Sequence, residues 1–125
     1  MITFPRTVQV WAFAKPIDLR KSYNGLWGLI KEELHRDPMS GDLFLFSNRR
    51  RKGCKVLLWD GTGICIMMKR LERGQFAALW SADGQAVKMT ATELALFIEG
   101  SAYVGRHALS PEAISTAQLA PADRL

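Results

Sequence analysis

Residues 43–70, L-F-L-F-S-N-R-R-R-K-G-C-K-V-L-L-W-D-G-T-G-I-C-I-M-M-K-R, decide the fold of this chain. Short apolar runs at 43–46, 55–60 and 64–70 are separated by the turn sequences N-R-R-R-K-G and G-T-G, and a further run follows at 75–80. Short strands joined by tight turns predict an antiparallel meander. The uninterrupted apolar residues 64–68 predict a central strand buried on both faces, or a strand that a partner covers.

Patterns on either side of this region complete the fold. Residues 8–14 alternate as in a strand, and Asp18 is placed to cap a helix that Pro38 ends. The inward face of this helix is expected to hold Leu19, Tyr23, Leu26, Trp27, Ile30 and Leu34. Residues 90–93, T-A-T-E, match a capping box for a second helix with Leu94, Phe97 and Ile98 inward, and Gly100 has the position of a C′ glycine.

These patterns predict the α+β class, with a mostly antiparallel sheet and two packed helices. We expect a single domain over residues 1–106 and a flexible, disordered tail over residues 107–125, where large apolar residues are few.

Composition limits the function classes. A chain of 125 residues with 48% hydrophobic and 23% charged residues is one globular domain, too small to contain a complete transposase, polymerase or helicase. No apolar run is long enough to span a bilayer, and residues 8–14 are too short and polar for a signal peptide. Cys54 and Cys65 lie too far apart on the predicted hairpin for a disulfide, which indicates free thiols and a reducing cytoplasm.

The positive charge is concentrated in one part of the sequence. The net charge is +5, and residues 49–73 hold eight cations against only Asp60 and Glu72. A hairpin folded about residues 61–63 is expected to put Lys55 beside Lys69. The candidate nucleic-acid-binding residues are Arg49, Arg50, Arg51, Lys52, Lys55, Lys69, Arg70 and Arg73. Arg20 and Lys21 would extend this surface if the start of the first helix lies nearby.

Clustered cations allow two interpretations. Like charges repel one another, so their clustering favours a surface that contacts phosphates, whereas a charged rim that protects a sheet edge is the alternative. Aromatic side chains could stack on bases, and Phe44 and Phe46 flank the basic turn. The four tryptophans lie in apolar runs, which favours packing over base stacking.

No pattern predicts catalysis. The carboxylates with a possible role in metal-dependent chemistry all occur at caps or turns, and they are Asp18, Asp42, Asp60, Glu72 and Asp83. His35 and His107 show no metal-ligand spacing to the cysteines, and no nucleophile or phosphate-loop motif occurs. We therefore expect no catalytic residues, no metal, no cofactor and no small-molecule substrate.

Four ordered motifs resemble one protein family. They are P-I-D-L-R-K-S-Y-N-G-L at 16–26, D-P-M-S-G-D-L-F-L-F-S-N-R-R-R at 37–51, K-V-L-L-W-D-G-T-G at 55–63 and K-R-L-E-R-G-Q-F at 69–76. This pattern resembles the small TnpB-like accessory protein encoded by the second open reading frame of insertion-sequence-66-type bacterial transposable elements. The resemblance covers about residues 7–105 and implies a role in transposition beside a separate, larger DDE transposase that supplies the chemistry.

The charge pattern and the resemblance point to one function. We expect a non-catalytic accessory protein of insertion-sequence transposition in the bacterial cytoplasm, which binds DNA at the element ends through the basic hairpin and acts with the transposase, with no membrane partner. One alternative is an adaptor that docks on the transposase without touching DNA. A second alternative is a metal-dependent nuclease that uses Asp60.

Overall fold

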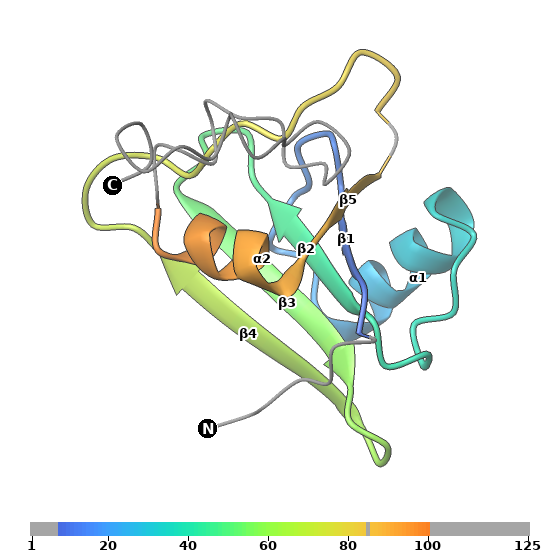
Figure 1. The fold of residues 1–125 in the computed structure, drawn as a ribbon. Helices are drawn as coiled ribbons and strands as arrows, with labels where there is room; N and C mark the ends of the chain where they lie inside the picture. Colours follow the sequence, from blue (N-terminus) through green and yellow to red (C-terminus); the bar gives the residue numbers. More distant parts are fainter. Residues whose placement is uncertain (1–7, 85, 101–125) are drawn as a thin grey trace, which may run out of the picture.

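The computed structural model describes residues 8–84 and 86–100, which contain a five-stranded sheet and two helices (Figure 1). The elements in chain order are β1 Val10–Ala12, α1 Tyr23–Glu33, β2 Leu43–Ser47, β3 Gly53–Trp59, β4 Ile64–Arg70, β5 Val87–Met89 and α2 Ala91–Ile98. The sheet order is β4-β3-β2-β1-β5. The α+β class is confirmed, and the predicted tail at 107–125 lies outside the described residues.

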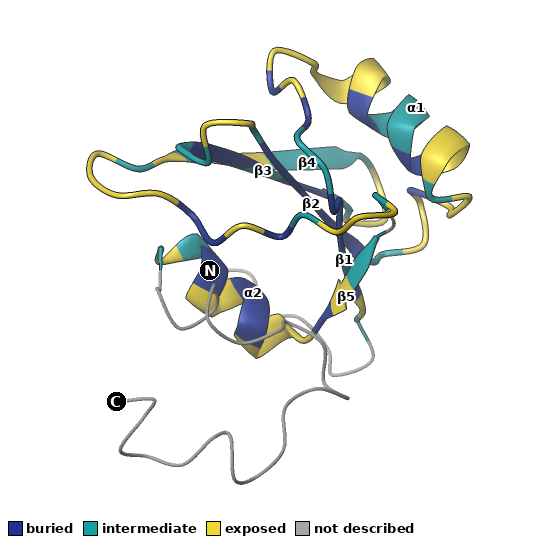
Figure 2. Ribbon diagram, turned by 90° about the horizontal axis from the view of Figure 1, so that it is seen from above, coloured by how far each residue is buried: buried dark blue, intermediate teal, exposed yellow. Residues whose placement is uncertain are grey.

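The sheet is mixed. Strands β2, β3 and β4 form the predicted antiparallel meander, but β1 is parallel to β2 and antiparallel to β5. Adjacent parallel strands need a crossover connection, and α1 supplies it between β1 and β2. The two helices lie on opposite faces of the sheet, which gives three layers (Figure 2).

Each face of the sheet has its own apolar core. On the α1 face, Leu26 and Ile30 of the helix are fully buried, and the rings of Phe13 and Phe46 stack at a centroid distance of 4.8 Å. On the α2 face, Phe97 of the helix stacks on Phe76 at 4.9 Å. Full burial of each such side chain stabilises the fold by about 1.5–3 kcal/mol, so both helices are fixed mainly by their apolar faces.

The first helix starts later than the sequence pattern predicts. Asp18 is not its N-cap, because the Asp18 carboxylate accepts hydrogen bonds from the backbone and side chain of Arg20 and so closes a local turn. The helix begins at Tyr23 after Ser22, whose side chain makes no capping hydrogen bond. Tyr23, expected to face inward, is 48% exposed.

The predicted strand at 75–80 is wrong. The segment forms no ladder, but crosses the α2 face, where Phe76, Ala77 and Leu79 are buried in the core. Its backbone is held by the Phe76 N–H, which donates to the Arg51 carbonyl oxygen at 2.6 Å. The pairing of β5 with β1, which the sequence did not indicate, occupies the other edge of the sheet.

The second helix follows the prediction. Thr90 and Glu93 form both hydrogen bonds of the capping box, and Leu94 and Phe97 are buried. Gly100 has φ +79°, the left-handed conformation that a C′ residue needs. This helix therefore has a well-defined start and end.

Strand β4 lies at an edge of the sheet, so its prediction as a central strand buried on both faces is wrong. Its side chains are half-buried or exposed, with Met68 at 58% exposure.

Both cysteines are free, as expected, although only Cys54 is buried. Burial raises the pKa of the Cys54 thiol to about 11. Over the described ranges, no helix has the length and apolar character that crossing a bilayer requires.

Candidate nucleic-acid interface

The turn between β2 and β3, residues 48–52, carries four of the eight candidate cations. Asn48 organises this turn, because its side-chain oxygen accepts hydrogen bonds from the backbone N–H groups of Lys52 and Gly53, at 3.1 and 3.3 Å. Gly53 is closely packed, since a Cβ there would lie 3.2 Å from the Leu19 side chain, which would have to shift. The turn is therefore held by its own backbone, with Arg49 and Arg50 exposed at its tip.

Arg51 connects the turn to the segment that crosses the α2 face. Its backbone has φ +58°, a conformation that non-glycine residues adopt only when surrounding contacts enforce it. Its guanidinium donates to the Phe76 carbonyl oxygen at 3.3 Å and to the Gln75 side-chain oxygen at 3.2 Å. No sequence pattern indicates this structural role, because Arg51 is one of three consecutive arginines.

The expected pairing of Lys55 with Lys69 is wrong by one residue. Lys55 pairs with Met68, and Lys69 pairs with Cys54. Adjacent residues of a strand point to opposite faces, so this shift puts the two lysines on different sides of the sheet. Lys55 lies on the α1 face opposite Phe46, whereas Lys69 lies on the α2 face.

Both lysines bind carbonyl oxygens. The Lys55 ammonium donates to the Lys21 carbonyl oxygen at 2.8 Å. The Lys69 ammonium donates to the carbonyl oxygen of Ile98 at 2.7 Å, which satisfies an end group of α2 and places a cation at the negative end of the helix. These two side chains stabilise the fold at the margin of the basic region.

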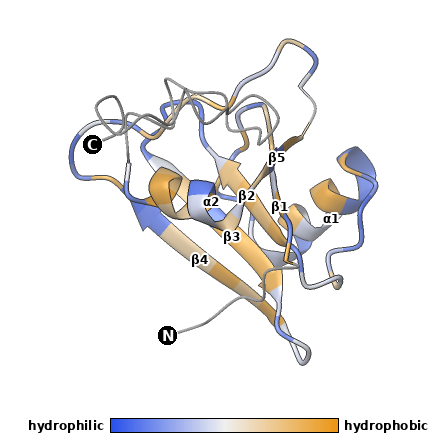
Figure 3. Cartoon of the chain, in the orientation of Figure 1, coloured by the Kyte–Doolittle hydropathy of each residue, from blue (hydrophilic) through white to orange (hydrophobic). Residues whose placement is uncertain are grey.

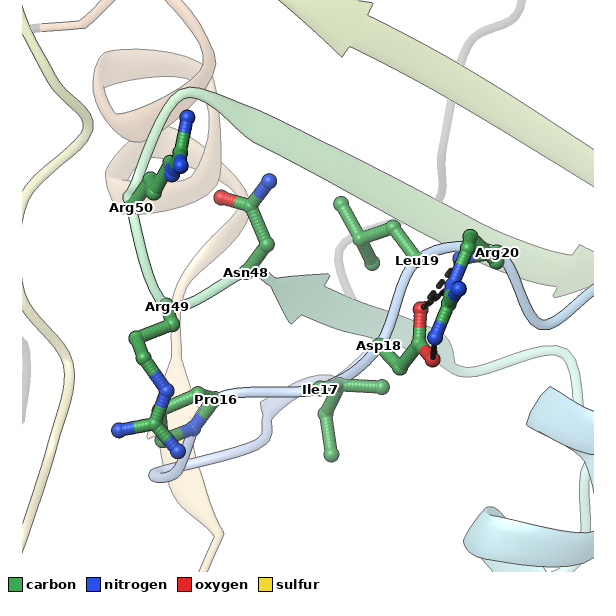
Figure 4. Close-up of a pocket in the computed structure, with 8 residues that line it drawn as sticks. All are labelled: Pro16, Ile17, Asp18, Leu19, Arg20, Asn48, Arg49 and Arg50. Atoms are coloured by element: carbon green, nitrogen blue, oxygen red, sulfur yellow. Dashed lines mark hydrogen bonds and ion pairs between the residues drawn. The ribbon is translucent and has the colours of Figure 1, made fainter.

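Four of the remaining candidate cations line two hollows. The first, of about 590 Å³, is lined by the 16–20 segment and by Asn48, Arg49 and Arg50 (Figure 4). The second, of about 670 Å³, is lined by Arg50, Lys52, Arg70, Leu71, Glu72 and Gln75. Arg50 lines both hollows, so they form one surface, which we call the basic ridge: Arg49, Arg50, Lys52 and Arg70. Arg73 is exposed and lines neither hollow.

Arg20 borders the first hollow, so the segment before α1 does extend the basic region. It also makes an ion pair with Asp18 at 2.8 Å. Hydrogen bonds from Arg20 lower the pKa of the Asp18 carboxyl to about 2. The charge of Arg20 is therefore compensated locally, unlike that of Arg49 on the opposite side of the same hollow (Figure 4).

No carboxylate of the described residues makes an ion pair with the basic ridge. The ion pairs in residues 8–84 and 86–100 are Lys15–Glu33 and Asp18–Arg20, and neither includes one of the eight candidate cations. Glu72 lines the second hollow without an ion pair to its cations. Uncompensated cations around shallow hollows at a sheet end can attract and hold a phosphate-rich polymer.

Asp60 has a structural function in the β3–β4 turn. Its carboxylate accepts hydrogen bonds from the Thr62 backbone at 2.9 Å, the Thr62 hydroxyl at 3.1 Å and the Gly63 backbone at 2.9 Å. These bonds lower the pKa of Asp60. The described part of the chain contains no group of three or more His, Cys, Asp and Glu side chains placed to hold a metal ion.

The aromatic residues beside the turn do not reach the surface. Phe44 and Phe46 are completely buried in the α1-face core, so base stacking on them is excluded. The tryptophans are half-buried, and Trp11 packs under the Arg36 guanidinium at 3.4 Å while its indole N–H donates to Asp42. The basic ridge therefore offers cationic rather than aromatic contacts.

Comparison with known proteins gives the family. The sequence model described as "IS66 Orf2 like protein" matches residues 8–107, which include all the elements of the fold. The chain belongs to the IS66 Orf2-like family. Its place in that family makes it an accessory protein associated with transposition, as the motifs at 16–26, 37–51, 55–63 and 69–76 implied.

Two relatives of this IS66 Orf2-like protein come from Sinorhizobium fredii (strain NBRC 101917 / NGR234). The uncharacterized protein y4jC is 34% identical over 100 residues, which cover 80% of this chain and 85% of y4jC. The uncharacterized protein y4hO is 34% identical over 101 residues, with 80% and 86% coverage. No solved structure matches the chain significantly.

Proposed function

We propose that this protein is a non-catalytic, DNA-binding accessory factor of insertion-sequence transposition, which acts beside a separate transposase. The basic ridge contacts the phosphate backbone of DNA at the element ends. The observation that carries the proposal is the arrangement of Arg49, Arg50, Lys52 and Arg70 around two joined hollows, where they make no ion pair with a carboxylate of residues 8–84 or 86–100.

The geometry favours phosphate contact over base readout. Arginine forms bidentate hydrogen bonds with phosphate, and the exposed guanidinium groups of Arg49 and Arg50 are available for them. Arg73 lies close in sequence to the second hollow and adds a fifth exposed or half-exposed cation. Arg51, Lys55 and Lys69 already donate to oxygen atoms of the protein, so they contribute mainly field and structure.

A salt titration of DNA binding tests the proposal. About five phosphate contacts predict a slope of −4 to −5 in a plot of log affinity against log salt concentration. The double variant Arg49→Gln/Arg50→Gln is expected to reduce the magnitude of this slope by about 2. Lys31→Gln/Lys88→Gln removes the same charge from exposed positions on α1 and β5, outside the ridge, and is expected to leave the slope nearly unchanged.

The adaptor and nuclease alternatives give different results. Absence of binding at low salt to element-end DNA, combined with capture of the transposase, favours the adaptor. Strand cleavage that needs magnesium or manganese and disappears in Asp60→Asn favours the nuclease. The hydrogen bonds that Asp60 receives from its own turn support the expectation that this substitution affects the hairpin rather than any cleavage.

A further inference from the structure

Strand β4 presents an unusually unprotected edge. Its seven residues pair with β3 without a bulge, and no strand of the described part of the chain pairs with its other side. Exposed edges are commonly protected by prolines, bulges or charges, yet residues 64–68 are all apolar (Figure 3). Met67 and Met68 at its centre are 39% and 58% exposed.

The hydrogen bonds at the two ends of the β3–β4 pair show which backbone groups point outward. The Asp60 N–H donates to Gly63 at 3.1 Å, and the Leu71 N–H donates to Lys52 at 2.8 Å. Hydrogen-bonded and non-hydrogen-bonded positions alternate along an antiparallel pair. The backbone N–H and C=O groups of residues 63, 65, 67, 69 and 71 therefore point towards β3. The N–H and C=O groups of Ile64, Ile66, Met68 and Arg70 therefore point to the open edge.

We propose that β4 pairs antiparallel with β4 of a second copy of this chain, about a twofold axis at Met67. In this register Ile66 lies opposite Met68 of the second copy, and Ile64 lies opposite Arg70. All four outward-facing residues of each copy then fall in hydrogen-bonded pairs, which continues the sheet across both molecules. A register centred on Ile66 instead places Arg70 opposite Thr62 of the second copy, which lies in the β3–β4 turn. A register centred on Met68 places Ile64 opposite a residue beyond the C-terminal end of β4 in the second copy.

Charge also selects this arrangement. Lys69 and Arg70 occupy one end of the strand, and the antiparallel register sets them opposite Cys65 and Ile64 of the second copy. A parallel arrangement would instead align the cations of the two copies, which is destabilising. The apolar side chains of Ile66, Met67 and Met68 from the two copies thus meet at the centre of the contact, and the flexible methionine side chains can fill it.

This pairing does not depend on DNA binding, but it would affect the basic ridge. The twofold axis is perpendicular to the sheet, so the two ridges lie at opposite ends of the paired β4 strands. Since Arg70 lies opposite residue 64 of the second copy, the two Arg70 positions are about 20 Å apart along the strands.

The mass of the full chain in the absence of DNA tests the proposal. Sedimentation equilibrium is expected to show a concentration-dependent dimer. Met68→Lys puts an ammonium group in the contact and is expected to shift the equilibrium to monomer. The control Met39→Lys changes another exposed methionine, in the loop before β2, and is expected to keep the dimer. A wild-type monomer at every concentration overturns the proposal, whatever its affinity for DNA.

Cross-linking tests the register. In a Cys65→Ser background, Met67→Cys is expected to form a covalent dimer under mild oxidation, because residues opposite each other at a non-hydrogen-bonded site have Cα atoms about 4.5 Å apart. In the wild type, Cys65 lies on the same face but about 14 Å from its twin, so it is expected to remain free. Equal cross-linking of the two proteins would reject the register and leave only random collision.

Discussion

Replacement of Arg51 by alanine should destabilise the fold without weakening the salt dependence of DNA binding. The substitution removes the hydrogen bonds of the guanidinium to Phe76 and Gln75, which measure 3.3 and 3.2 Å. Hydrogen bonds of this kind contribute about 0.5–1.5 kcal/mol each, so the expected loss in the free energy of unfolding from the two bonds is about 1–3 kcal/mol. Alanine keeps the strained backbone at φ +58°.

Arg51→Gly separates the side-chain contribution from the backbone contribution. Glycine loses the same hydrogen bonds but adopts the left-handed conformation without strain, so it should be about 1 kcal/mol more stable than the alanine variant. The matched control is Arg50→Ala. The Arg50 side chain makes no hydrogen bond within the described part of the chain, so this substitution should change the free energy of unfolding by less than about 0.5 kcal/mol.

Urea denaturation measures these differences as shifts in the midpoint at constant slope. The same variants separate the two functions of the turn, because Arg50→Ala should reduce the magnitude of the salt slope by about 0.9 and Arg51→Ala should not. If Arg51→Ala leaves stability unchanged and reduces the salt slope as Arg50→Ala does, the assignment of Arg51 to a structural role is wrong.

Three other predictions concern parts outside the turn. Thr90→Ala removes the cap of α2 and should lower the free energy of unfolding by about 1 kcal/mol in urea denaturation, whereas Thr92→Ala, an exposed position in the same turn, should not. The Asp18 carboxyl should titrate near its pKa of about 2 in NMR spectra. Because folding lowers this pKa, the ionised carboxyl stabilises the fold above pH 4, and this stabilisation disappears as the pH falls towards 2. Arg20→Gln should return the pKa of Asp18 towards its ordinary value of 3.8. Alkylation should modify Cys65 in the native protein but Cys54 only after unfolding, because Cys54 is completely buried and its pKa is raised to about 11. Rapid modification of both thiols in the native protein would contradict this prediction.

The elements with strong local signals could be predicted from sequence. The capping box at Thr90 and the glycine at 100 define α2, and the turn sequences define the β2–β3–β4 meander. The parallel pairing of β1 with β2 could not be predicted in this way, since it depends on α1 packing over the sheet. The segment at 75–80 resembles a strand because Phe76 and Leu79 are apolar, but they pack against α2 instead of pairing.

The cluster of cations could be located in the sequence, but its geometry depends on one hydrogen bond. The sequence G-T-G suggested a three-residue turn, whereas Gly63 pairs with Asp60 through the Asp60 N–H and the turn contains only Gly61 and Thr62. Gly61 has φ +103°, which permits this tight connection. The resulting shift of one residue separates Lys55 from Lys69, so clustering in sequence overstated their clustering in space.

The contacts of Arg51 have a mechanical consequence for the whole molecule. The turn that carries Arg49 and Arg50 is hydrogen-bonded to Phe76, and the ring of Phe76 stacks on Phe97 of α2. The same C-terminal end of this helix is held by the hydrogen bond from Lys69 to Ile98. The helix at 91–98 therefore acts as a brace behind a loop more than forty positions earlier in the chain. A force that a bound polymer applies to the loop would therefore be transmitted to the helix on the α2 face of the sheet, instead of bending the hairpin alone.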